Sequence, residues 1–208
     1  MVSYDPNEAV PMVVNGAINA LKAAAQEPSI KRVVMTSSST AAASPQPNVE
    51  FSMDESTWNE EAVEAAWKWM QENKPGFIFN TVLPNANMGA VLSPEHQGTP
   101  STAGRVKALW DEFKGQEKLA FNPPQYFVNV QDTVRVHVGA LIYPDVNGER
   151  LFDFAYPCTW NDILAIFRKL YPDHHFMANI PNLGKDPSKV ANELGRDVRE
   201  LVHVLNLR

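Results

Sequence analysis

The sequence of 208 residues contains a single cysteine, Cys158. It therefore cannot form an intrachain disulfide or a thiolate metal cluster, and such sparse cysteine usage is typical of a reducing compartment. No apolar run approaches the roughly 18 residues that a transmembrane helix needs. The first residues also lack the basic region and apolar core of a signal peptide. We therefore expect a cytoplasmic protein with no membrane-spanning segment.

Basic residues are also scarce. The chain carries 18 Lys and Arg against 24 Asp and Glu, which gives a net charge of −6. Nucleic acids and anionic membranes require clustered basic residues, and here they are scattered, so both partners are excluded. A hydrophobic content of 44% and a charged content of 20% are ordinary for a folded globular protein. The length suits one domain, or one domain with a small additional lobe.

The first half of the chain alternates helical and strand patterns. Apolar residues at helical spacing predict a helix over 10–25, and a short β-branched run predicts a strand over 32–35. A Thr-x-x-Glu capping box predicts that the next helix covers 57–73. The continuous apolar run at 77–83 is typical of a strand that is covered on both faces. Together these elements predict a right-handed βαβ unit in a parallel sheet.

The second half is rich in proline and predicts longer loops. The segment 84–94 is expected to be irregular and to follow the carboxyl end of a strand, where α/β sheets place ligands. Asp132 is expected to cap the start of a helix. The remaining predicted elements are a strand at 149–155 and helices at 101–113, 131–142, 160–170, 187–194 and 196–206.

Five consecutive hydroxyl residues follow the first predicted strand, at positions 36–40. Such side chains commonly cap turns by bonding to the local backbone, and spacing alone favours that role. A serine at the carboxyl end of a parallel strand can instead donate a hydrogen bond to a substrate carbonyl. The residue pattern leaves both interpretations open. His174 and His175 are adjacent and therefore point in different directions, so the sequence predicts no metal site.

Several segments carry a family resemblance, including KRVVMTSSSTAAA (31–43), FNTVLPNANMGAVLSPEHQGTPST (79–102) and TWNDILAIFRKLYP (159–172). The chain resembles the extended short-chain dehydrogenases/reductases of the NAD-dependent epimerase/dehydratase family. Within that family it looks most like the fungal carbonyl and aldehyde reductases and the dihydroflavonol reductases. The resemblance implies an α/β fold in which residues 1–90 form part of a Rossmann-like parallel sheet without its first strands. Residues 91–208 would then form a smaller C-terminal α/β substrate lobe that also contributes to the sheet.

The same resemblance implies roles for residues at the ends of the two strands. Ser38 would be catalytic, donating to the carbonyl oxygen as negative charge develops there. Two simpler interpretations stay open: that Pro84 and Asn85 only form a turn after the second strand, and that Asn15 is only a polar residue in the middle of a helix. The other implied residues are Thr36, Ser37, Pro84 and Asn85 for the cofactor, Asn87 and Met88 for the substrate, and Asn15 for a proton-relay water.

The implied activity is reduction of a ketone or aldehyde, a small-molecule substrate, with NADP(H) expected as cofactor rather than NAD(H). The family's proton donor is a tyrosine with a lysine four positions later, and none of the five tyrosines here has that lysine. None of the ten glycines has the G-x-x-G-x-x-G spacing that brings a pyrophosphate to a helix. We therefore expect a chain that is truncated at its N-terminus, internally deleted and weakly active. The alternatives are a non-catalytic fragment or pseudoenzyme, or a nucleotide-sugar epimerase or dehydratase relative.

Overall fold

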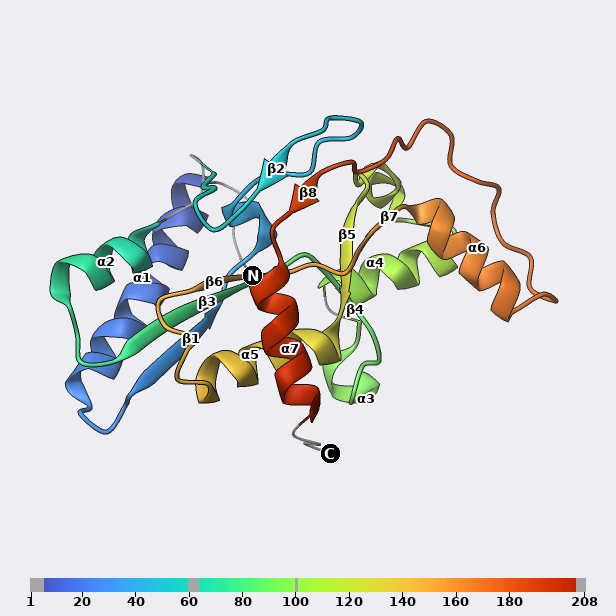
Figure 1. Cartoon of the computed structure of the whole chain (residues 1–208). Helices are drawn as coiled ribbons and strands as arrows, with labels where there is room; N and C mark the ends of the chain where they lie inside the picture. The colour runs from blue at the N-terminus through green and yellow to red at the C-terminus, as the bar shows by residue number, and fades with distance from the viewer. Residues whose placement is uncertain (1–5, 60–63, 100, 205–208) are drawn as a thin grey trace.

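A computed structural model describes residues 6–59, 64–99 and 101–204. Its central element is a parallel sheet of three strands in the order β1 (Arg32–Thr36), β3 (Ile78–Pro84) and β6 (Arg150–Asp153), as Figure 1 shows. Every residue of β6 is buried, and β3 is buried from Phe79 to Pro84. In the described part of the chain β1 lies at the edge and pairs with β3 alone. The predicted α/β class with a parallel sheet is confirmed.

Helices cover both faces of this sheet (Figure 1). One face is covered by α1 (Pro6–Gln26) and α2 (Ala65–Asn73). The opposite face is covered by α5 (Val130–Ile142) and α7 (Glu193–Val204). The buried side chains between helices and sheet are Leu21, Ala24, Ala66, Phe77 and Phe79 on the first face, and Val82, Val136, Ala140, Val146, Leu151 and Val198 on the second.

Two polar side chains join β1 and β3 to the end of α5. Asn80 is fully buried, and its amide donates to the carbonyls of Ala140 and Val146 at 3.0 Å each. Its carbonyl oxygen accepts from the backbone N–H of Glu149 at 2.9 Å. Arg32 donates to the same two carbonyls. Because buried polar groups must be paired, these bonds fix how α5 ends against the sheet.

A second, mixed sheet contains β4 (Ala86–Met88), β5 (Gln125–Asn129) and β7 (Tyr156–Cys158). It packs near α4 (Ser101–Trp110) and α6 (Trp160–Leu170), which share one apolar core. Short helical segments also occur at Pro94–Gln97 (α3), Ser39–Ala41 and Glu117–Phe121. This second unit lies on the side of the molecule away from α1 and α2 (Figure 1).

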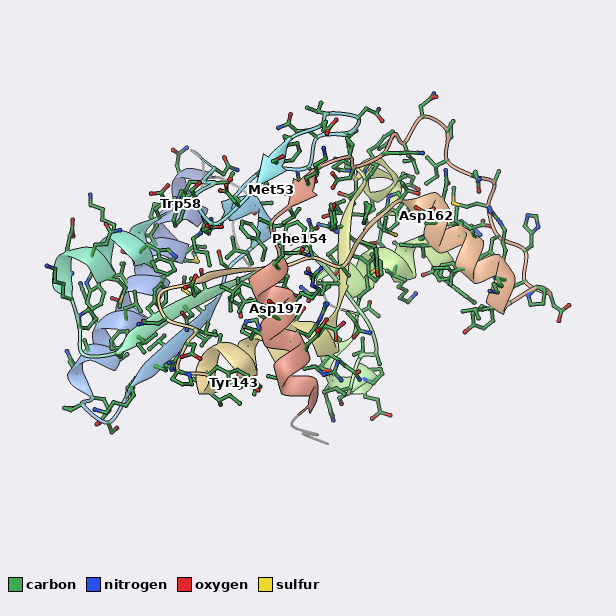
Figure 2. All side chains as sticks on the ribbon, in the orientation of Figure 1. Met53, Trp58, Tyr143, Phe154, Asp162 and Asp197 are labelled. Atoms are coloured by element: carbon green, nitrogen blue, oxygen red, sulfur yellow. The ribbon has the colours of Figure 1, made fainter. Side chains whose placement is uncertain are left out.

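A third pairing joins distant parts of the chain, because β2 (Ser52–Met53) runs parallel to β8 (Lys189–Val190). Beneath it lies an apolar cluster that includes Met53 and Phe154, both labelled near the centre of Figure 2. Among the described helices, none combines the length and the apolar character that a bilayer crossing requires.

Helix boundaries differ most from the sequence prediction at the starts of two helices. Helix α1 begins at Pro6 rather than at residue 10, so Pro11 lies inside the helix. Helix α2 begins at Ala65 instead of residue 57. The hydroxyl of Thr57 bonds to Asp54, at 3.0 Å from the Asp54 backbone N–H and 3.1 Å from its carboxylate. The local Asp-x-x-Thr turn therefore uses the hydroxyl that the capping box required, and Glu60 lies outside the described residues.

Two further predictions are wrong, and a third, for the segment 84–94, is wrong in part. The segment expected to be helical over 187–194 contains β8, because Lys189 and Val190 find strand partners in β2. Asn129, not Asp132, caps α5, since its side chain accepts from the N–H of Gln131 at 2.9 Å. The segment 84–94 is also more regular than expected, because it contains β4. The capping box at the start of α6 is present, with Thr159 and Asp162 bonded reciprocally (Figure 2 labels Asp162).

Candidate active site

A cleft of about 540 Å³ lies at the carboxyl ends of β1 and β3. Its walls come from both strand ends, from β4 and the segment after it, and from the first turns of α4 and α5. Seven of the eight residues that the resemblance implied line this one cleft: Thr36, Ser37, Ser38, Pro84, Asn85, Asn87 and Met88. The eighth, Asn15, is exposed on α1 and is not among the lining residues.

Ser38 has the capping role that the sequence left open, and its place in the cleft keeps the second role available. Its Oγ accepts from the backbone N–H of Thr40 at 3.2 Å and so caps the turn at Ser39–Ala41. It also lies 2.9 Å from the Thr40 hydroxyl. If Thr40 is the donor in that pair, the Ser38 O–H stays free to donate into the cleft, since a hydroxyl has one proton and two lone pairs. The cap then fixes the position of the donor.

Thr36 is connected to a titratable group behind the cleft wall. Its hydroxyl lies 2.8 Å from Nε2 of His137, on α5. Nδ1 of the same ring lies 2.7 Å from the carbonyl oxygen of Thr133. A carbonyl oxygen only accepts, so Nδ1 carries a proton and the neutral ring accepts from Thr36 through Nε2.

Asn87 is held in place from two helices. Its side-chain oxygen accepts from the Thr133 hydroxyl on α5 at 2.7 Å. Its backbone carbonyl accepts from the hydroxyl of Thr102 on α4. Its amide nitrogen donates to the carbonyl of Asn85 at 3.3 Å, which leaves a second N–H for other partners. These bonds fix the orientation of Asn87 in the cleft wall.

Asp153 lies at the end of β6 and is almost fully buried, with one carboxyl oxygen unpartnered in the described part of the molecule. Burial raises the pKa of this carboxyl above its usual range, against the opposing effects of Thr133 and Arg199. The Thr133 hydroxyl has a single proton and already donates it to Asn87. That hydroxyl therefore has no second proton for the Asp153 carboxylate, and burial remains the dominant effect on the pKa of Asp153.

The sequence pattern does not reveal His137, Thr133 or Asp153 as neighbours of the site. Thr133 and His137 are four residues apart and share one face of α5. In the sequence, this four-residue spacing is the one indication that Thr133 and His137 act together. Their position near the site depends on the packing of α5 against β1 and β3.

None of the described lining residues of the cleft is ionisable. The lining is apolar or carries hydroxyl and amide groups, so it suits an uncharged ligand and hydrogen bonds to a carbonyl or carboxamide. It contains no lysine to contact a ribose and no arginine or lysine to contact a phosphate. The residues present therefore fit the nicotinamide end of a dinucleotide, and the described lining supplies no cationic side chain for its pyrophosphate.

No protein-family model matches the chain. Aldehyde reductase 2 of Sporidiobolus salmonicolor is 40% identical over 215 residues, covering 89% of this chain and 61% of the relative. Ketoreductase adrE of Penicillium rubens is 40% identical over 189 residues, covering 81% of this chain and 54% of the relative. The crystal structure of the yeast methylglyoxal/isovaleraldehyde reductase Gre2 in complex with NADPH has a TM-score of 0.70 at 20% identity. It covers 89% of this chain and 64% of that one.

The chain thus spans roughly three fifths of the length of the curated relatives it matches. Within the match to aldehyde reductase 2, the 215 aligned positions include 89% of the 208 residues, or about 185. About 30 aligned positions therefore fall opposite gaps in this chain, and the relative has residues there that this chain lacks. At 20% sequence identity, the similarity to Gre2 shows a shared fold and no more.

Proposed function

The chain belongs to the short-chain dehydrogenase/reductase family, among the aldehyde reductases and ketoreductases, and from this premise we propose that it reduces aldehydes or ketones with NAD(P)H. One observation carries the proposal. Ser38 and the Pro84–Asn85 segment, from adjacent parallel strands, line the same uncharged cleft. Such a cleft outside the carboxyl ends of the strands is where this class of sheet binds ligands.

Ser38 is the residue to which we assign the chemistry. Its O–H donates to the substrate carbonyl oxygen and stabilises the negative charge that develops there. The bonds to Thr40 hold Oγ before the substrate arrives, so no reorganisation is needed at that moment. Asn87, fixed by Thr133, presents its remaining N–H toward the substrate.

The cofactor would lie along Thr36, Ser37, Pro84 and Asn85, with its ring against the end of β3. When bound, it supplies a hydride to the carbonyl carbon. The family resemblance favours NADP(H) over NAD(H). The single cysteine is in keeping with a reducing cytoplasm as the place of reaction.

The proton for the carbonyl oxygen must come from outside the described cleft lining, which has no ionisable side chain. Water is the source we assign, since the Thr36 hydroxyl already donates its single proton to Nε2 of His137. General-acid assistance is typically worth roughly 10²–10⁴-fold in rate. We therefore expect turnover below that of relatives with a tyrosine and lysine pair by about this factor.

The test is to titrate the purified chain with NADPH and with NADH and to follow the fluorescence of the reduced nicotinamide. Turnover is then measured on an activated ketoester. Ser38→Ala should lower turnover by about 10²-fold or more, whereas Ser38→Thr retains the hydroxyl and should recover part of it. Thr40→Ala removes the bond between the two hydroxyls but keeps Ser38, so its turnover should fall much less.

Failure to bind either nucleotide would reject the proposal for this chain. Equal turnover of the Ser38→Ala variant and the unmodified chain would reject the assignment of Ser38.

A further inference from the structure

A second groove of about 660 Å³ opens from the cleft and runs between α4 and α6. The two spaces share lining residues where they meet, namely Met88, Gly89, Val91 and Ala103. A ligand seated at Ser38 can therefore extend past this junction into the groove. Figure 1 shows α4 and α6 together, in the half of the molecule away from α1 and α2.

The junction requires a glycine. Gly89 has a φ of +151°, and a Cβ there would lie 2.7 Å from Cγ1 of Val130. A side chain at this position would be strained and would press on the wall of the cleft. The junction is kept open by a residue that has no side chain.

The apolar face of α6 extends beyond the residues that pack in the core. Trp160, Ile163 and Leu164 are buried against α4 and account for the packing of the helix. Ile166 and Leu170 are also apolar, yet they are 54% and 63% exposed. They lie three and seven residues after Ile163, so they continue its stripe along the groove.

The facing wall on α4 has the same character. Ala103, Val106 and Trp110 recur at helical spacing along the groove. Trp110 closes the far end, with its ring centroid 5.3 Å from Phe167 and 4.9 Å from Tyr171. Lys107 is the one charged side chain among the described lining residues, and it is paired with Asp111. An uncharged, apolar ligand segment matches this lining.

We propose that this groove binds the apolar tail of the substrate, so that the chain selects aldehydes and ketones with an extended alkyl or aryl group. The inference rests on the proposed function, which places the carbonyl at Ser38. Its own support is the continuity of the two spaces and the exposed apolar stripe on α6. Ala103 and Trp110 are seven positions apart on α4, which corresponds to about 10 Å of helix at 1.5 Å per residue. A tail of comparable length would fill the groove.

The test measures binding rather than turnover, so that it does not depend on the cofactor. Straight-chain methyl ketones of increasing length are titrated against the full chain, and binding is followed by ligand-observed NMR. Each added methylene that enters the groove should tighten binding by up to about four-fold. The gain should stop when the tail reaches Trp110.

Two variants place the effect in the groove. Ile166→Glu puts a charge into the wall and should abolish the dependence on chain length. Leu141→Glu is the matched control, since Leu141 is 50% exposed on α5 and lines neither the groove nor the cleft. Val106→Phe narrows the groove without touching the cleft and should weaken long ketones while short ones bind as before.

Affinities that do not change with chain length would overturn the proposal, as would equal losses in the Ile166→Glu and Leu141→Glu variants. A dimer in sedimentation that Ile166→Glu dissociates, with no ketone binding, would show that a second copy covers the groove and would also overturn it. If long ketones bind but no NADPH-dependent turnover occurs, the groove assignment stands and the proposed reductase activity fails.

Discussion

The hydroxyl of Thr36 lies 2.8 Å from Nε2 of His137, and this contact joins the end of β1 to the middle of α5. The two residues are 101 positions apart in the sequence. His137 also bonds to the Thr133 carbonyl, so the ring is fixed on both nitrogens. The pair connects the cleft to the helix that supports its back wall.

We predict that Thr36 and His137 are energetically coupled. Thr36→Val keeps the shape of the side chain and removes its hydroxyl, while His137→Phe removes the ring nitrogens. A double-mutant cycle in urea unfolding should give a coupling free energy of about 0.5–1.5 kcal/mol, the usual net value of one hydrogen bond. Strictly additive effects of the two substitutions would mean that the contact does not stabilise the fold.

We predict opposite effects from two substitutions of helical glycines by alanine. A Cβ on Gly139 in α5 would lie 2.3 Å from Cγ1 of Val198 in α7, so Gly139→Ala should destabilise the protein by about 1–3 kcal/mol. For Gly16 in α1, no atom of the described residues lies within 4 Å of such a Cβ, apart from its chain neighbours and the backbone of its own helix. Gly16→Ala should therefore stabilise by about 0.5–1 kcal/mol, since alanine favours a helix interior. Thermal unfolding of both variants measures the difference, and a neutral Gly139→Ala would contradict the close packing of α5 on α7.

Much of the central sheet and of the cleft could be predicted from local sequence. The strand at 32–35, the strand at 77–83 and the helix at 160–170 each have a periodicity or cap of their own, and all three are present. The hydroxyl cluster and the segment after Leu83 lie at one end of a parallel sheet. For that reason their convergence on one cleft followed from topology alone.

The missed elements depend on partners far away in the sequence. The three-residue strand β4 is stable because it pairs with β5, about 40 residues later. Lys189 and Val190 become a strand because Ser52 and Met53 lie beside them. A local pattern carries no information about such partners. The same reason hides the bond from Thr133 on α5 to Asn87 on β4, and the place of Asp153 near them at the end of β6.

We predict that Asp153→Asn stabilises the protein at neutral pH. Burial raises the folded-state pKa of Asp153, so the folded protein keeps this proton at pH values where the unfolded chain, with a pKa of about 3.9, has lost it. The stability that the protonated carboxyl provides is fully present below the pKa of Asp153 in the unfolded chain. It is lost as the pH rises through the higher pKa of Asp153 in the folded protein. The gain from Asp153→Asn should therefore be small at about pH 3 and larger at about pH 7.

Urea unfolding across this pH range measures the gain. Asp145→Asn is the matched control, because it removes an exposed carboxylate by the same substitution. A gain from Asp153→Asn that is the same at both pH values would mean that Asp153 is already ionised in the folded state.

We predict finally that Cys158 reacts slowly in the folded protein. Burial, with a smaller contribution from Asp162, raises the pKa of this thiol to about 11 from 9.0. Since the thiolate is the nucleophile, this shift lowers its population by about 100-fold at neutral pH. Alkylation by iodoacetamide, followed by intact mass, should be slower by about that factor in native protein than in urea. Asp162→Asn removes the lesser cause and should accelerate the native reaction only modestly. Equal rates in the native and the unfolded chain would show that the thiol is accessible and its pKa normal.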